Sequence, residues 1–134
     1  SKIIRMDRYP EGITEGPMAG MDGQVLSGEF ELNGQRFICL DGGPIFKFNE
    51  SISFTVDCAD QAEVDYYWEK LSAVPESEQC GWCKDKFGLS WQIVPRRLGE
   101  LLSDPDKEKS GRAMQAMLQM HKINVQELED AFNG

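Results

Sequence analysis

The sequence predicts an α+β protein with a single domain over residues 1–134, in which short strands are half covered by helices. Two observations carry this prediction. Turn signals separate strands of alternating apolar and polar residues, and capping signals start helices between and after those strands. The order of the elements indicates a repeated β-α-β-β-type unit whose first copy lacks its opening strand and helix.

The amino-terminal third predicts a strand, a loop and a hairpin. Residues 2–6 are expected to form a strand, and residues 10–22 a Gly- and Pro-rich loop of the kind that often covers a pocket. Asn33-Gly34 is the two-residue turn that suits a hairpin best. It therefore predicts paired strands over residues 24–32 and 35–41.

The middle of the chain predicts a strand and then a helix. Residues 51–57 alternate between small polar and apolar side chains, which is typical of a strand with one buried face. Asp60 and Glu63 have the spacing of a capping box and predict the start of a helix. The apolar stripe of that helix consists of Val64, Tyr67, Trp68 and Leu71.

A second hairpin is expected over residues 80–95. Residues 85–88 end in glycine and predict its turn, and Pro95 ends the second strand because it has no N–H to donate. Leu89, Trp91 and Ile93 then lie on one face of that strand, and Ser90 and Gln92 on the other.

The remaining residues predict helices. Residues 98–102 form one, Asp104 and Pro105 are expected to cap and begin a second that runs to Met120, and Asn124 with Glu127 begins a third. Four residues at the end of this segment are expected to fall on one face: Met114, Met117, Leu118 and His121.

The charge and hydropathy of the chain limit the classes of partner that we expect. The net charge of −9 does not favour nucleic-acid binding, which requires clustered Lys and Arg. No apolar run is long enough to span a bilayer, and residues 1–5 do not have the apolar core of a secretion signal. We therefore expect no membrane partner and a cytoplasmic location.

The cysteines are expected to be free thiols. Cys80 and Cys83 have the spacing of a redox dithiol, but the pair opens a hairpin rather than a helix, whose N-terminus would lower the thiol pKa. A zinc site that adds Cys39 and Cys58 would have only one C-x-x-C pair. His121 is the only histidine and is expected to pack rather than to act as a base or ligand.

Three stretches carry a family resemblance. DGGPIFKFNESISFTVDCADQAEVDYYWEKL, CGWCKDKFGLSWQIVP and LLSDPDKEKSGRAMQAMLQMHKI resemble the PhnB-like branch of the vicinal oxygen chelate superfamily, which includes the glyoxalase and bleomycin-resistance folds. The resemblance implies paired βαβββ modules that form a curved mixed sheet around a pocket, usually in a homodimer. Family members begin about one strand and one helix before Ser1, so it also implies a truncated first module.

The resemblance implies that the metal site of the superfamily is absent. The ligand positions that can be matched correspond to Ser51 and Gln92, where the metal enzymes have His and Glu. A serine hydroxyl is a weak ligand at neutral pH, and an amide oxygen lacks the carboxylate charge. We therefore expect no metal and no other cofactor.

Strand alternation combined with the resemblance predicts a pocket of neutral polar groups. The opposite face, which includes Phe54, Val56, Trp91 and Ile93, is expected to contact helices, together with Ile52. A pocket of hydroxyl and amide groups suits a small polar or aromatic molecule. The residues expected to line it are Ser51, Ser53, Thr55, Ser90 and Gln92.

The preferred hypothesis is a homodimeric small-molecule-binding protein that acts by sequestration or by a metal-independent reaction. The rival is a metal-dependent lyase, isomerase or dioxygenase in which Gln92 is a weak ligand and Glu29 or Asp41 supplies charge. The branch also carries a 3-demethylubiquinone-9 3-methyltransferase label, which would require S-adenosylmethionine, although the sequence has no glycine-rich turn for that cofactor. A purely structural module is the remaining alternative. The catalytic residues, if any, stay open.

Overall fold

The computed structural model describes all residues from 1 to 134 and divides them into two compact units, Ser1–Phe46 and Lys47–Gly134. The first unit contains one three-stranded sheet, and the second contains another three-stranded sheet with four α-helices. The predicted α+β class is therefore confirmed. The pairing of complete βαβββ modules into one curved sheet stays a prediction, as does the single domain.

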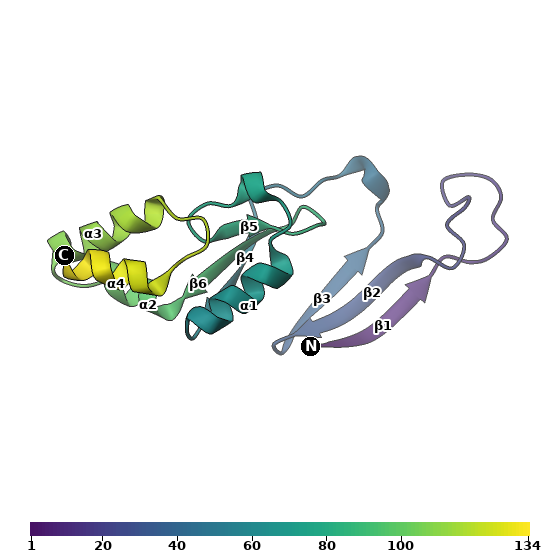
Figure 1. Cartoon of the computed structure of the whole chain (residues 1–134). Helices are drawn as coiled ribbons and strands as arrows, with labels where there is room; N and C mark the ends of the chain where they lie inside the picture. The colour runs from purple at the N-terminus through teal and green to yellow at the C-terminus, as the bar shows by residue number, and fades with distance from the viewer. The chain divides into compact units, whose positions relative to one another are not determined.

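The first unit is an antiparallel sheet in the order β1-β2-β3 (Figure 1). Its strands are β1 (Lys2–Arg8), β2 (Val25–Leu32) and β3 (Gln35–Leu40), and a short 3-10 helix, η1 (Gly43–Ile45), follows. Asn33 and Gly34 both have positive φ, as the predicted two-residue turn requires. The loop predicted over residues 10–22 contains no helix or strand.

The β1-β2-β3 sheet has one apolar face. Phe30 lies opposite Phe37 on β3 and opposite Ile3 on β1, and the two phenylalanine rings stack with centroids 5.4 Å apart. The other face is mostly charged, with the ion pair of Arg36 with Glu29. Ile3 on this face is 68% exposed, whereas Phe30 and Phe37 are partly buried.

The second unit has a mixed sheet in the order β4-β6-β5. β4 (Ser53–Cys58) runs parallel to β6 (Ser90–Pro95), and β5 (Trp82–Lys84) runs antiparallel to β6. The predicted capping box starts α1 (Gln61–Leu71). The Asp60 carboxylate accepts the Glu63 N–H at 3.0 Å, and the Glu63 carboxylate accepts the N–H of Ala59 at 2.7 Å.

Helix α1 covers one face of this sheet (Figure 1). The predicted stripe is confirmed, since Val64 is fully buried and Tyr67, Trp68 and Leu71 pack around it. The strand side chains in that cluster are Val56, Cys58, Cys83, Trp91 and Ile93. Ile52, also expected on this face, precedes β4 and is 67% exposed.

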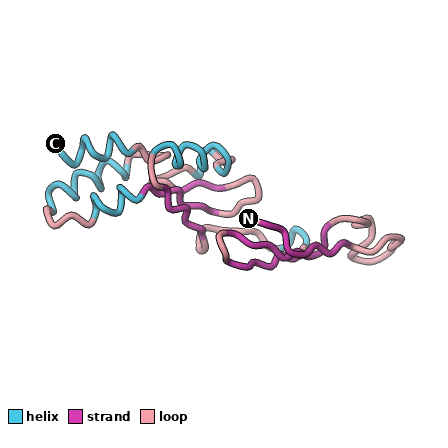
Figure 2. Tube along the Cα trace, turned by 90° about the horizontal axis from the view of Figure 1, so that it is seen from below, coloured by secondary structure: helices cyan, strands magenta, loops and turns pink.

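The three carboxyl-terminal helices follow β6 and lie together beyond its end (Figure 2). They are α2 (Arg96–Leu102), α3 (Lys107–Leu118) and α4 (Val125–Asn133), and a 3-10 turn, η2 (Pro75–Ser77), precedes β5. Their shared core contains Leu98, Leu101, Ala113, Met120, Ile123 and Leu128. None of the helices combines the length and apolar composition that a membrane crossing requires.

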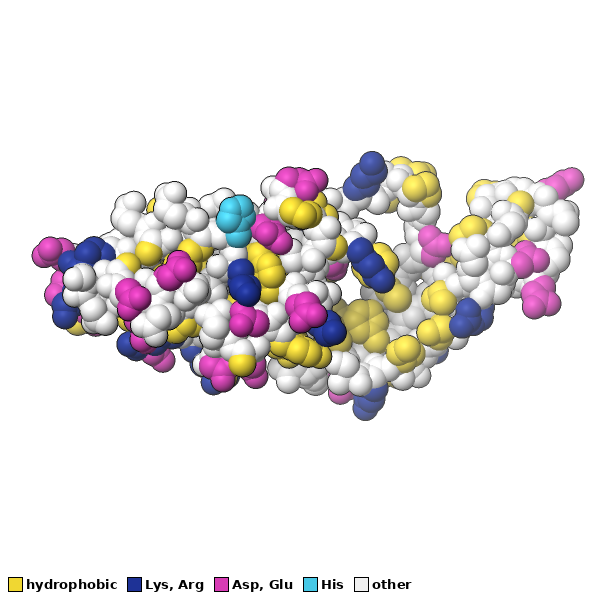
Figure 3. All heavy atoms as spheres, in the orientation of Figure 1, with side chains coloured by type: hydrophobic (Ala, Val, Ile, Leu, Met, Phe, Trp, Pro, Cys, Tyr) yellow, Lys and Arg dark blue, Asp and Glu magenta, His cyan; other side chains and the backbone are white.

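One prediction about α3 is wrong. Its cap is Asp106 rather than Asp104, because the Asp106 carboxylate accepts the N–H groups of Glu108 and Lys109. Its buried side includes Ser110 and Ala113, whose small side chains allow close packing. Of the residues expected to share a face, Met117 packs against the core, whereas Met114 and Leu118 are 45% and 44% exposed. His121 is also on the surface (Figure 3).

Candidate functional site

The face of the β4-β6-β5 sheet opposite α1 carries two rows of polar side chains. Each row crosses the three strands, because residues directly opposite one another in neighbouring strands share a face. The first row is Ser53, Ser90 and Lys84, and the second is Thr55, Gln92 and Trp82. We call these six residues the polar face.

Four of the five residues predicted to line a pocket belong to this polar face: Ser53, Thr55, Ser90 and Gln92. Ser51 lies before β4 and is exposed, and its N–H and hydroxyl both bond to the side-chain oxygen of Asn49. The alternation of the strands therefore brings four predicted residues together. The pocket itself stays a prediction.

Gln92 lies on the central strand of the polar face, between Thr55 and Trp82. Its amide nitrogen donates to the hydroxyl of Ser53 at 2.9 Å, which links β6 to β4. This bond leaves the amide oxygen of Gln92 without a partner in the chain, and it leaves the hydroxyl proton of Ser53 free to be donated. The centre of the face thus presents one free acceptor and two free donors, since the second N–H of the Gln92 amide also has no partner.

Ser90 is the most unusual residue of the polar face. It is only 2% exposed, yet its hydroxyl makes no hydrogen bond within the chain. Every side-chain oxygen or nitrogen that is fully buried has a partner, so the Ser90 oxygen keeps a narrow opening to solvent. A nearly buried polar group without a partner costs free energy unless water or a ligand bonds to it.

Sequence reasoning missed Trp82 and Lys84. Both face the same side because alternation in β5 places them opposite Gln92 and Ser90. A signal exists in the sequence, since Trp82 and Lys84 occupy alternate positions just before the predicted turn and would share one face of a strand. Lys84 forms an ion pair with Glu50, which lies ahead of β4.

The Cys80–Cys83 motif forms a tight turn and not the start of a helix. Cys80 and Gly81 have φ of 50° and 84°, and Gln79 and Trp82 exchange backbone hydrogen bonds of 3.0 and 2.8 Å around them. The two cysteines consequently have different environments, because Cys80 is partly exposed and Cys83 is 2% exposed.

The buried thiols are poorly suited to redox chemistry. Burial, with smaller contributions from the charges of nearby carboxylates, raises the pKa of both Cys58 and Cys83 to about 11. A reactive dithiol requires a thiolate at neutral pH, which usually needs a lowered pKa. The expectation of free thiols fits these environments.

The two residues at the matched ligand positions are a weak fit to a metal ion. No group of three or more His, Cys, Asp or Glu side chains is arranged to hold one. At the matched positions, the Ser51 hydroxyl bonds to Asn49 and the Gln92 amide bonds to Ser53. Serine and amide groups without a carboxylate or imidazole are a weak donor set for the divalent metals of such enzymes.

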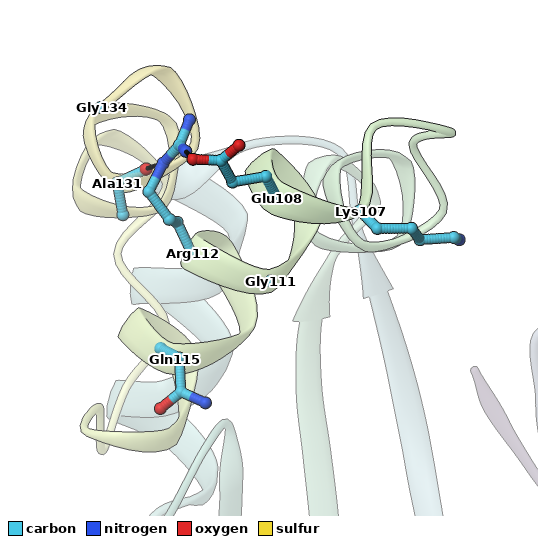
Figure 4. A pocket seen from close by; sticks show the side chains of 7 residues that line it. All are labelled: Lys107, Glu108, Gly111, Arg112, Gln115, Ala131 and Gly134. Carbon is cyan, nitrogen blue, oxygen red and sulfur yellow. Dashed lines mark hydrogen bonds and ion pairs between the residues drawn. The ribbon is translucent and has the colours of Figure 1, made fainter.

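A hollow of the second unit lies elsewhere, between α3 and α4 (Figure 4). It is open to solvent, with a volume of about 700 Å³, and Figure 4 shows Arg112 at one end, beside Glu108. The guanidinium of Arg112 donates to the carbonyls of Ala131 and Phe132 at 2.9 and 2.7 Å. Since these bonds cap the end of α4, we assign this hollow to packing and prefer the polar face as the site.

The fold and the polar face are those of an α+β chain in which α1 covers one face of a mixed sheet and hydrogen-bonding groups, with one lysine, occupy the other. The comparisons with known proteins place such a chain among the PhnB-like proteins. More particularly, the chain belongs to the family whose model is described as 3-demethylubiquinone-9 3-methyltransferase, which matches residues 1–94. This is the PhnB-like branch.

A solved structure supports the same assignment. The PhnB protein from Bacillus cereus is 34% identical, with a TM-score of 0.54, over 69% of this chain and 78% of that chain. A search of curated proteins finds no match. The predicted family is therefore confirmed.

Proposed function

We propose that this protein binds a small organic molecule on the polar face, by sequestration or with a metal-independent reaction. The observation that carries the proposal is the hydroxyl of Ser90, which is almost buried and makes no hydrogen bond in the chain. The free amide oxygen of Gln92 and the exposed Thr55 hydroxyl extend the same surface. A ligand that bonds to these groups would offset the cost of leaving them unpaired.

A fragment screen followed by amide NMR shifts tests this proposal. Binding fragments should shift the backbone amides of Thr55, Ser90 and Gln92. Gln92→Leu should abolish these shifts, because it removes the amide. The matched control is Gln126→Leu, since the Gln126 amide bonds only to Asp130 of its own helix. If the fragments instead shifted mainly the backbone amides of α3 and α4, the proposal would be overturned.

The alternative function is a metal-dependent enzyme, and it predicts a bound metal ion. It would need Gln92 as a ligand and the charge of Glu29 or Asp41. Asp41 is already bonded to the Tyr9 hydroxyl at 3.1 Å, and Glu29 is paired with Arg36. Native mass spectrometry before and after chelation separates the two functions. One divalent ion per subunit that requires Gln92 would support the metalloenzyme.

We also propose a homodimer. The support is the apolar face of the β1-β2-β3 sheet, where Ile3 and Met6 are 68% and 42% exposed. Contiguous apolar surface in water commonly marks an interface. The same native mass spectrum gives the subunit number, and a monomer at micromolar concentration would contradict this part of the proposal.

A further inference from the structure

Lys84 gives the polar face its only positive charge. The side chain is opposite Ser90 across the β5–β6 pair, and it is 20% exposed. Its ammonium group contacts the carboxylate of Glu50, whose own side chain is 64% exposed. The carboxylate of Glu50, from the segment before β4, thus contacts the residue that lies opposite Ser90 in the β5–β6 pair.

On the polar face, the groups that can only donate a hydrogen bond outnumber those that can only accept one. The indole N–H of Trp82 and the hydroxyls of Thr55 and Ser90 have no partner in the chain, and the Ser53 hydroxyl already accepts a bond and is therefore free to donate. Against these donors, the amide oxygen of Gln92 is the free acceptor that cannot also donate. With the ammonium of Lys84 beside it, this set suits an oxyanion better than a cation.

The Glu50 carboxylate behaves as an internal stand-in for such an oxyanion. The hydrogen bond from Lys84 lowers the pKa of Glu50, so the carboxylate stays ionised and paired at neutral pH. Because Glu50 is largely exposed, its ion pair is solvent-screened and contributes little to folding. Displacement of this side chain by another carboxylate is therefore inexpensive.

We propose that the ligand of the polar face is a small carboxylate with a planar apolar body, whose carboxylate replaces Glu50 on Lys84 and receives the Ser90 hydroxyl proton in a hydrogen bond. The body of the ligand lies along the second row towards Trp82, which is partly exposed and belongs to neither core cluster. Glu50 is a competitor for the site. This inference rests on the proposed function and names its ligand class.

Benzoate and its neutral analogue benzamide test the charge requirement. In NMR titrations of the full chain, benzoate should shift the amides of Lys84 and Ser90 and bind at least about tenfold more tightly than benzamide, as a charge-assisted bond in a partly buried site implies. Added salt should weaken benzoate binding and leave benzamide unchanged.

Three variants test the residues. Lys84→Met should weaken benzoate binding about tenfold and leave benzamide binding unchanged. Glu50→Gln should strengthen benzoate binding several-fold, because it removes the competitor. Lys70→Met is the matched control, since Lys70 is on α1 at the other face of the sheet and should change nothing. Circular dichroism verifies that each variant is folded.

The outcomes separate this inference from the proposed function. Equal binding of benzoate and benzamide at the polar face, unaffected by Lys84→Met, would overturn the carboxylate inference and leave the proposed function standing. An unchanged benzoate affinity in Glu50→Gln would overturn the role of Glu50. If neither probe shifts the polar face, the inference is overturned, and the fragment screen decides the proposed function independently.

Discussion

The indole N–H of Trp91 donates to the carboxylate of Asp85 at 2.9 Å and ties β6 to the turn that precedes it. The other carboxylate oxygen accepts the backbone N–H groups of Phe87 and Leu89 at 2.8 and 3.1 Å. One side chain therefore satisfies three donors and fixes the turn between β5 and β6. Since that turn sets the register of the two strands, it also positions Lys84 opposite Ser90.

Replacing Asp85 by alanine should destabilise the protein. The variant loses a charged acceptor for three donors, and we expect the free energy of unfolding to fall by about 2 to 3 kcal/mol. Urea unfolding monitored by far-UV circular dichroism measures this change. The control is Glu69→Ala at an exposed site on α1, which should cost less than about 0.5 kcal/mol. Equal effects of the two substitutions would remove the special role of Asp85.

Gly81→Ala should also destabilise the protein, by about 2 to 4 kcal/mol. Gly81 has a φ of +84°, which is strained for an L-residue, and an added Cβ would lie 3.1 Å from both the Ile93 carbonyl and the Ile123 side chain. Gly111→Ala is the control with the opposite sign. It lies within α3 with nothing within 4 Å of the new Cβ, so it should stabilise by about 0.5 to 1 kcal/mol. Thermal unfolding measures both changes. If the two substitutions shifted the melting temperature in the same direction, this account would be contradicted.

Local signals predicted the strands and turns of this chain because they act over a few residues. The turn at Asn33-Gly34 and the capping box of Asp60 were predictable from the types of residue alone. The cap of α3 was not predictable in this way, because either aspartate of Asp104-Pro105-Asp106 could begin a helix. Only the hydrogen bonds from the N–H groups of Glu108 and Lys109 identify Asp106 as the cap.

The polar face was likewise only partly predictable from the sequence. Alternation within β4 and β6 placed Ser53, Thr55, Ser90 and Gln92 on one side, as expected. The contribution of β5 depends on pairing between strands, and the contact between Glu50 and Lys84 spans 34 positions of sequence. Contacts of that kind arise from tertiary structure, so composition and spacing alone do not reveal them.

The buried thiols predict a stability that declines in alkali. The pKa of Cys58 and of Cys83 is raised from 9.0 to about 11 in the folded protein. Between these values the unfolded chain has lost thiol protons that the folded chain retains, so the free energy of unfolding falls as the pH rises. Each thiol contributes a slope of up to about 1.4 kcal/mol per pH unit.

Urea unfolding at several pH values between about 8 and 11 checks this slope. Cys58→Ala and Cys83→Ala should each make the curve flatter. In the wild-type protein at pH 8, a thiol reagent should modify Cys39 and Cys80 well before the other two. Rapid modification of all four thiols in the folded state would contradict the burial that causes the raised pKa.

Gln61 should couple α1 to the carboxyl-terminal helices. Its amide nitrogen donates to the Ile123 carbonyl at 3.0 Å, and its amide oxygen accepts the Val125 N–H at 2.8 Å. Gln61→Ala leaves both backbone groups unpaired beside the fully buried Ile123, so we expect a loss of about 2 kcal/mol and faster amide hydrogen exchange in α4. Gln126→Ala, which removes a bond within α4 alone, should cost less than about 0.5 kcal/mol. If exchange in α4 were equally fast in both variants, the two backbone bonds of Gln61 would not be what anchors the start of that helix.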